Sequence, residues 1–136
     1  GPAYLLIVDI DYFKRINDSH GHKVGDLVLC RVADLLKASA RQGDLTCRLG
    51  GEEFVIIALN TDRAGALQLA ERARAAIEQS EVPGRSAGGP IRCTVTIGVS
   101  AAFTESQVFD EYIQQADAAL YRGKAAGRNR VEWAQA

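Results

Sequence analysis

The chain has 136 residues, of which 47% are hydrophobic and 24% are charged, and its formal net charge at pH 7 is -1. This length and composition are typical of one globular domain, and the near-neutral charge gives no overall attraction to nucleic acid or to an anionic membrane surface. No apolar run approaches the ~20 residues that a membrane-spanning helix requires. We therefore expect a cytoplasmic domain that neither binds nucleic acid nor inserts into a membrane.

The cysteines and the N-terminus add two expectations. Cys30, Cys47 and Cys93 fit no zinc or redox spacing, so free thiols in a reducing compartment are expected. The chain begins with Gly-Pro directly before an apolar run and contains no methionine. Such a start is typical of an excised domain, so we expect residues 1–2 to be a tag remnant and residues 3–136 to be the domain itself.

The first half of the chain predicts a strand, a helix and a hairpin. Tyr4–Ile10 (YLLIVDI) is a continuous apolar run, which is typical of a central strand covered on both faces. Residues 11–18 form a polar connection with a short helical turn, and apolar residues at helical spacing predict a helix over Lys23–Ala40. Two short strands, Leu45–Leu49 and Glu53–Leu59, are joined through a Gly-Gly pair that suits the positive φ of a tight turn.

The second half continues the alternation of helices and strands. Its elements are, in chain order, a helix capped by Thr61 or Asp62 and running to about Gln79, a glycine- and proline-rich loop Val82–Pro90, a strand Ile91–Ser100 with one buried face, a long helix from about Phe109 to near Gly127, and a short strand Asn129–Trp133. Together the elements predict an α/β (α+β) fold, with a mixed, mainly antiparallel sheet and helices packed on it.

Carboxylates gather at the ends of the predicted strands. Asp9 and Asp11 share a parity at the end of the first strand, and Glu52 and Glu53 follow the glycine turn of the hairpin. Adjacent strand residues point to opposite faces, so only one of the two glutamates is expected to face a given ligand. If the first strand pairs beside the hairpin, these carboxylates form a hard-oxygen site suited to Mg²⁺ and substrate phosphates. Solvated turn residues are an equally good interpretation of the spacing alone.

Polar side chains near these strands suit a nucleotide. Basic residues can neutralise phosphates, and an amide or a carboxylate can hydrogen-bond the edge of a purine. Singly, each residue also fits an ordinary surface, turn or capping role. Together they suggest a nucleotide site, with Lys14, Lys124 and Arg128 for the phosphates, Asn17 and Asp26 for the base, and His22 between Gly21 and Gly25, a spacing that lets a ligand approach the backbone.

The sequence closely resembles the GGDEF family of diguanylate cyclases in three blocks. GGEEF (Gly50–Phe54) is one of the two usual spellings of the family signature. DIDYFKRINDSHGHKVGD (Asp9–Asp26) precedes it, and ADAALYRGKAAGRNRV (Ala116–Val131) follows it. The resemblance implies a nucleotidyl-cyclase palm, with a central five-stranded sheet flanked by helices. It also implies that the protein condenses two GTP molecules into cyclic di-GMP and releases two pyrophosphates.

The resemblance implies a role for each matched residue. Glu52 would deprotonate the ribose 3′-hydroxyl as well as bind Mg²⁺, for which Mn²⁺ could substitute, and Asp11 receives no ligand role. The implied sets are Asp9, Glu52, Glu53 and the backbone oxygen of Ile10 for the metal, with Glu53 the less certain member; Glu52 and Lys14 for catalysis; Asn17, His22, Asp26, Gly50, Gly51, Lys124 and Arg128 for GTP; and Arg41, Asp44 and Arg72 for an inhibitory product site.

The inhibitory site is implied by an R-x-x-D motif. Arg41 and Asp44 stand where the family carries its site for bound product, and Arg72 resembles the secondary arginine of that site. An arginine can bind a guanine edge or a phosphate, and an aspartate can accept from guanine. The alternative is a helix-end pair whose aspartate starts the next turn. The position of the motif relative to Gly50 favours product binding.

The chain departs from the family before its first strand. Family members usually carry a D-x-L-T-x-L-x-N-R-R helix there, which lines the nucleotide pocket, and this sequence begins after it. We therefore expect slow turnover or none from the fragment alone. One domain presents one GTP, so catalysis requires a homodimer with facing half-sites, normally brought together by an upstream sensory or dimerisation domain. A non-catalytic sensor of cyclic di-GMP or GTP is the main alternative, and a class III purine nucleotide cyclase is a more distant one.

Overall fold

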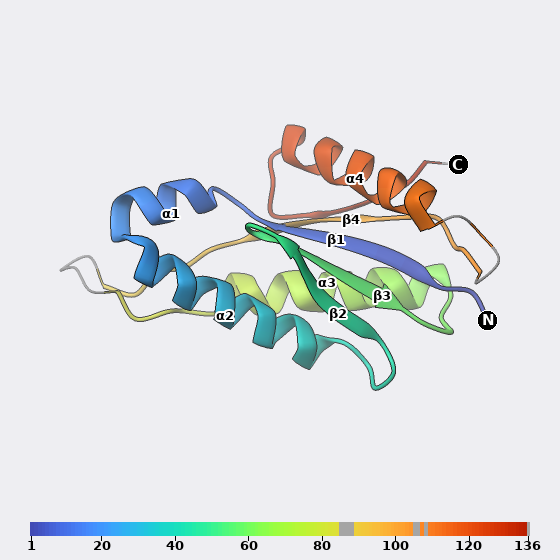
Figure 1. Cartoon of the computed structure of the whole chain (residues 1–136), viewed down its shortest axis with the longest axis horizontal. Helices are drawn as coiled ribbons and strands as arrows, with labels where there is room; N and C mark the ends of the chain where they lie inside the picture. Colours follow the sequence, from blue (N-terminus) through green and yellow to red (C-terminus); the bar gives the residue numbers. More distant parts are fainter. Residues whose placement is uncertain (85–88, 105–106, 108, 136) are drawn as a thin grey trace.

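The computed structural model describes residues 1–84, 89–104, 107 and 109–135. The elements are β1 (Tyr4–Ile10), α1 (Phe13–His20), α2 (His22–Ser39), β2 (Leu45–Gly50), β3 (Glu53–Ala58), α3 (Arg63–Gln79), β4 (Val95–Val99), α4 (Phe109–Ala125) and β5 (Val131–Trp133). They form a five-stranded sheet in the order β2-β3-β1-β4-β5. Helices α2 and α3 cover one face of the sheet and α4 covers the other (Figure 1). The predicted fold class is confirmed.

The strand β1 lies at the centre of the sheet, as its apolar run predicts. It pairs antiparallel with β3 on one side and with β4 on the other. Leu6 and Val8 belong to the core cluster beneath α2 and α3, whereas Leu5 and Ile7 belong to the cluster beneath α4. Since β2 pairs antiparallel with β3 and only β5 runs parallel to its neighbour β4, the sheet is mainly antiparallel, as predicted.

The hairpin and the third helix also agree with their predicted turn chemistry. Gly50 and Gly51 have φ angles of 156° and 52°, which a residue with a side chain rarely adopts. The side chain of Asp62 caps α3 by accepting a hydrogen bond of 2.8 Å from the backbone N–H of Gly65. In the part of the chain that the structure describes, no helix is long and apolar enough to cross a membrane.

The region after β1 was predicted wrongly. Instead of a polar connection with one short turn, Phe13–His20 forms a two-turn helix, α1, which begins after Tyr12 in the left-handed conformation (φ 55°). The helix buries Ile16, while most of its other side chains are polar. A single buried position over two turns gives too little hydrophobic periodicity to reveal a helix in the sequence.

The fourth strand is shorter and more deeply buried than predicted. The predicted strand Ile91–Ser100 begins only at Val95, because Ile91 instead forms an isolated bridge with Val82. The alternation predicts one buried face, but every residue of β4 is buried. A Cβ at Gly98 would lie 2.1 Å from the backbone oxygen of Ala116. The small residues of that face therefore mark close packing of α4, not exposure to solvent.

Two further boundaries differ from the prediction. The last strand starts at Val131 instead of Asn129, because Asn129 has a φ of 46° and cannot extend the strand. Of the predicted loop Val82–Pro90, residues 85–88 lie outside the described residues. The three cysteines are free, as expected, and burial raises the pKa of the half-buried Cys93 thiol to about 11.

Candidate active site

The hairpin turn and the end of β1 lie side by side. In the antiparallel register Asp9 stands opposite Glu53, and the backbone N–H of Ile10 donates a hydrogen bond of 3.3 Å to the backbone oxygen of Glu52. The pairing that the sequence required for a carboxylate site is therefore present. Asp9 shares its strand face with Leu5 and Ile7, which pack beneath α4. This places its carboxylate on the α4 side of the sheet.

Asp9 is a buried carboxylate, and of its two oxygens only Oδ2 has a hydrogen-bond partner among the described residues. Its exposed fraction is 4%, and the amine of Lys124, in the last turn of α4, donates to Oδ2. Its Oδ1 has no hydrogen-bond partner among the described residues. Burial raises the pKa of Asp9, Lys124 opposes that rise, and the charges of Glu52 and Asp11 add to it. A cation on the free oxygen would satisfy this carboxylate.

Glu53 lies in the same field of negative charge. Burial is the main cause that raises the pKa of Glu53, and repulsion by Asp9 and Asp117 adds to it, while Lys124 partly opposes the rise. Excess negative charge beside a single lysine fits a divalent cation with few protein ligands. Among the described residues there is no group of three or more acidic, histidine or cysteine side chains arranged to hold a metal. The free oxygen of Asp9 and the negative charge at Glu53 suit a divalent cation that takes its other ligands from outside these side chains.

Asp11 connects three parts of the fold through hydrogen bonds to its carboxylate. Its carboxylate accepts hydrogen bonds from the hydroxyls of Thr94 (2.7 Å) and Thr96 (2.6 Å) and from the backbone N–H of Asn129 (3.0 Å). It thereby joins the end of β1 to β4 and to the turn between α4 and β5. The sequence assigned this aspartate no ligand role, and its hydrogen-bonding capacity is used by the fold.

The residues expected to contact guanine come from α1 and the start of α2. Asn17 lies on α1, and its Oδ1 is buried without a partner among the described residues. His22 begins α2, and Asp26 is exposed one turn further along. The sequence suggested that Gly25 lets a ligand approach the backbone. This is wrong, because the space above Gly25 is filled by Asn17, whose Oδ1 would lie 1.8 Å from an added Cβ.

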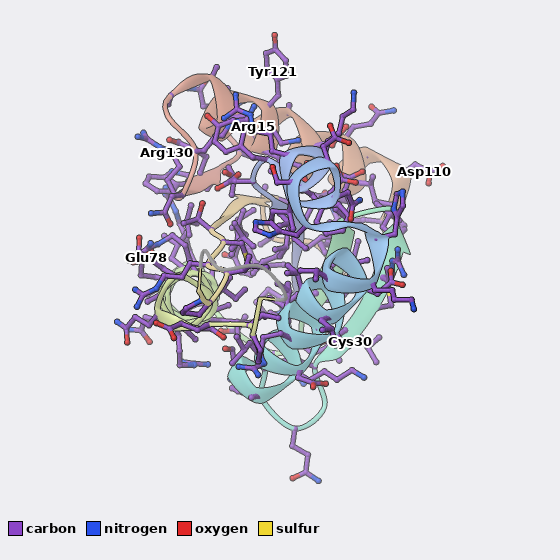
Figure 2. The ribbon with its side chains drawn as sticks, turned by 90° about the vertical axis from the view of Figure 1, so that its left-hand side faces the viewer. Arg15, Cys30, Glu78, Asp110, Tyr121 and Arg130 are labelled. Carbon is purple, nitrogen blue, oxygen red and sulfur yellow. The ribbon has the colours of Figure 1, made fainter. Side chains whose placement is uncertain are left out.

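The residues expected to contact the phosphates lie on α1, on α4 and in the turn that follows α4. Lys14 is exposed on α1, Lys124 reaches Asp9, and the guanidinium carbon of Arg128 lies 4.5 Å from the centroid of the Tyr12 ring. The guanidinium of Arg15 lies over the same ring at 4.2 Å. Figure 2 looks at this end of the molecule and labels Arg15. Nothing in the sequence indicates the contact between Tyr12 and Arg128, because no local pattern reveals a contact between residues so far apart in the chain.

The predicted product-site residues gather around the C-terminal end of α2. Asp44, whose side chain is 2% exposed, accepts hydrogen bonds from the backbone N–H groups of Arg41 (2.8 Å) and Leu59 (3.0 Å). The Arg41 side chain is 52% exposed and donates to the backbone oxygen of Leu59 at 2.6 Å. Arg72 donates to the backbone oxygen of Ser39. Asp44 thus fits the alternative of a helix-end turn, and both arginines lie at the same end of α2.

The chain is similar in sequence to a known protein family and to several curated proteins. The family model "Diguanylate cyclase, GGDEF domain" matches residues 1–130. The chain is 46% identical over 127 residues to diguanylate cyclase DgcM of Escherichia coli, covering 93% of this chain and 30% of DgcM. It is 41% identical over 127 residues to diguanylate cyclase A of Treponema denticola, covering 93% of this chain and 34% of that protein. The chain therefore spans about a third of the length of these curated relatives.

The fold is also similar to solved structures. The GGDEF domain of DgcB from Caulobacter crescentus, in complex with c-di-GMP, superposes with a TM-score of 0.91 at 32% identity, covering 99% of this chain and 79% of that chain. The active GGEEF domain of a diguanylate cyclase from Vibrio cholerae superposes with a TM-score of 0.87 at 33% identity, covering 99% of this chain and 84% of that chain.

Proposed function

This chain belongs to the GGDEF family of diguanylate cyclases, and on that premise we propose that it condenses two GTP molecules into cyclic di-GMP and releases two pyrophosphates. The observation that carries the proposal is the buried Asp9 carboxylate beside the GGEEF turn, with one oxygen on Lys124 and the other free. A site of this kind suits a metal nucleotide better than an ordinary strand end.

We propose that the hairpin carboxylates and β1 hold the metal. Asp9, Glu52 and the backbone oxygen of Ile10 would bind Mg²⁺, with Mn²⁺ as a substitute and Glu53 adding charge beside them. When bound, the ion supplies positive charge that stabilises the phosphates and the developing 3′-oxyanion. Glu52 accepts the proton of the ribose 3′-hydroxyl at its carboxylate. The glycines of the turn, Gly50 and Gly51, leave room for the substrate.

The other assigned residues bind and orient GTP. Lys14, Lys124 and Arg128 would contact the triphosphate, which fixes the leaving pyrophosphate relative to the attacking hydroxyl. Asn17 and Asp26 would hydrogen-bond the guanine edge, for which an amide and a carboxylate are suitable partners. His22, at the start of α2, would contact the nucleotide from the same side.

Each chain presents one such site, so we propose that two chains act as a homodimer whose half-sites face each other. We further propose that an associated sensory or dimerisation domain governs this pairing. Arg41, Asp44 and Arg72 would bind the cyclic di-GMP product and limit turnover. The half-exposed Arg41 guanidinium supports this proposal most directly: among the described residues it holds only the backbone oxygen of Leu59 and, at 3.7 Å, the Asp44 carboxylate, and it can exchange these partners for a guanine or a phosphate.

The test is chromatography of nucleotides after incubation with GTP and Mg²⁺. The parent chain, Glu52→Gln and a matched control, Glu111→Gln at an exposed position near the start of α4, should be compared. With two copies held together by a fused dimerisation domain, we expect cyclic di-GMP from the parent and the control and none from Glu52→Gln; the chain alone should turn over slowly or not at all. Binding of cyclic di-GMP without turnover, even when two copies are held together by a fused dimerisation domain, would reject the enzyme in favour of a sensor.

A further inference from the structure

Tyr12 lies between two arginines that come from opposite ends of the sequence. The guanidinium of Arg15, on α1, is 4.2 Å from the centroid of its ring, and that of Arg128, just after α4, is 4.5 Å from it. An arginine over the face of an aromatic ring is attracted by the negative potential of that face. The ring therefore gathers two positive charges beside the end of β1.

The backbone on both sides of this contact is held in an unusual conformation. Tyr12 has a φ of 55°, Arg128 a φ of 63° and Asn129 a φ of 46°, all in the left-handed region that residues with side chains rarely adopt. The two segments are joined by the hydrogen bond from the Asn129 backbone N–H to Asp11. A strained backbone conformation persists only where many surrounding interactions hold it in place, and such residues cluster at functional sites.

The Tyr12 ring contributes little to the core. Its side chain is 49% exposed, and the residue belongs to neither hydrophobic cluster. Burial of apolar surface therefore does not account for an aromatic residue at this strained position, where asparagine would be easier to accommodate. What the ring does contribute is a fixed surface for the two guanidinium groups.

We propose that Tyr12 is a positioning residue that holds the Arg128 guanidinium in place for the triphosphate. The proposal rests on the proposed function, in which Arg128 binds phosphate. A free arginine side chain loses considerable rotamer entropy when it binds a ligand, and a side chain already held on a ring loses less. The like charge of Arg15, on the same ring, would otherwise repel Arg128, and the ring offsets this repulsion before the substrate arrives.

The chain offers a variant that separates positioning from folding. Tyr12→Asn removes the ring but suits the left-handed backbone, so it should leave thermal stability unchanged or raise it. Tyr12→Phe keeps the ring and serves as the conservative variant. Tyr121→Asn is the matched control, because Tyr121 is 74% exposed on α4 and points away from the body of the molecule (Figure 2).

Binding should be measured by calorimetry with Mg²⁺, using a GTP analogue with an α,β-methylene bridge and, separately, guanosine. We expect Tyr12→Asn to weaken binding of the analogue about five-fold, which is about 1 kcal/mol, and to leave guanosine binding unchanged. Tyr12→Phe and Tyr121→Asn should bind like the parent. In an Arg128→Ala background, Tyr12→Asn should have no further effect, since the two changes remove the same contact.

Three outcomes would overturn the inference. If Arg128→Ala weakens analogue binding but Tyr12→Asn does not, Arg128 keeps its phosphate role and the ring does not position it. If Tyr12→Asn weakens guanosine binding equally, the ring has a general structural role. If Arg128→Ala has no effect on the analogue, the phosphate role of Arg128 in the proposed function fails as well.

Discussion

The amine of Lys124 donates a hydrogen bond to the buried carboxylate of Asp9, which ties the last turn of α4 to the end of β1. The lysine is the main group that opposes the rise in the pKa of Asp9 on burial. A residue assigned to substrate phosphates thus also stabilises the charge of a proposed metal ligand. Replacing Lys124 should therefore affect the stability of the fold as well as the binding of phosphates.

Lys124→Met should destabilise the fold by about 1–2 kcal/mol at pH 7, a value below that for fully buried pairs because the lysine is partly exposed. The folded-state pKa of Asp9 is already raised, and it rises further without the lysine. A carboxyl whose pKa is higher in the folded state does not lower the free energy of unfolding while it is protonated in both states. It lowers that free energy increasingly as the pH rises from the unfolded pKa toward the folded pKa. Urea unfolding at pH 7 and near pH 4 should therefore show a loss that shrinks at low pH. An equal loss at both values, or an undiminished loss in an Asp9→Asn background, would contradict this origin.

Mg²⁺ should raise the unfolding temperature of the parent chain, because a ligand that binds only the folded state stabilises it. The pKa values of Asp9 and Glu53 are raised by burial, and the metal needs their deprotonated forms. The stabilising effect of Mg²⁺ should consequently fade as the pH falls through the raised pKa values of these carboxyls. Differential scanning calorimetry with Mg²⁺ and with chelator would show this shift. Asp9→Asn should abolish the shift, and a variant that retained it in full would place the metal elsewhere.

Gly25→Ala should separate stability from base recognition. Alanine at a helix interior position favours the helix by about 1 kcal/mol over glycine. The added Cβ would nevertheless lie 1.8 Å from Oδ1 of Asn17, so that amide must move. We expect unchanged or higher thermal stability together with at least ten-fold weaker guanosine binding, an order of magnitude set by the loss of one or two hydrogen bonds. In an Asn17→Ala background, Gly25→Ala should change the affinity no further.

Arg41→Ala should relieve product inhibition with little effect on the fold. The arginine side chain is half exposed, and its removal leaves the backbone bonds to Asp44 intact. Asp44→Ala is the poorer probe, because it deprives two backbone N–H groups of their acceptor and should cost about 1–3 kcal/mol. Initial rates of pyrophosphate release with added cyclic di-GMP would test this. Inhibition of Arg41→Ala at the parent's concentration would exclude the arginine from the product site.

The sequence predicts most of the fold because its strongest signals are local. The apolar run of β1, the glycine pair and the Asp62 cap each determine one element without help from the rest of the chain. The alternation in β4 failed as a guide to exposure, because Gly98 and Thr96 are buried by α4 and by Asp11, and both partners are distant in sequence.

Some residues of the candidate site could likewise be predicted from local sequence, and others could not. The carboxylates at Asp9, Glu52 and Glu53 are found from strand ends and a turn, which are local features. The contact of Arg128 with Tyr12 and the hydrogen bond from the Leu59 backbone N–H to Asp44 depend on tertiary structure. No periodicity or spacing in the sequence indicates them. Recognition of the family supplied the residue roles, but it did not reveal these supporting contacts.

The hydrogen bonds of Asp11 also determine when the site can form during synthesis. This carboxylate is bonded to residues that follow it by 83 to 118 positions in the chain. The final partner, Asn129, adjoins Arg128, and the helix that carries Lys124 directly precedes them. A nascent chain that has completed the hairpin therefore has the GGEEF signature but not the contacts that hold the end of β1. These contacts form only after the last helix has left the ribosome, so a polypeptide interrupted before that point would lack the contacts on which the proposed activity depends.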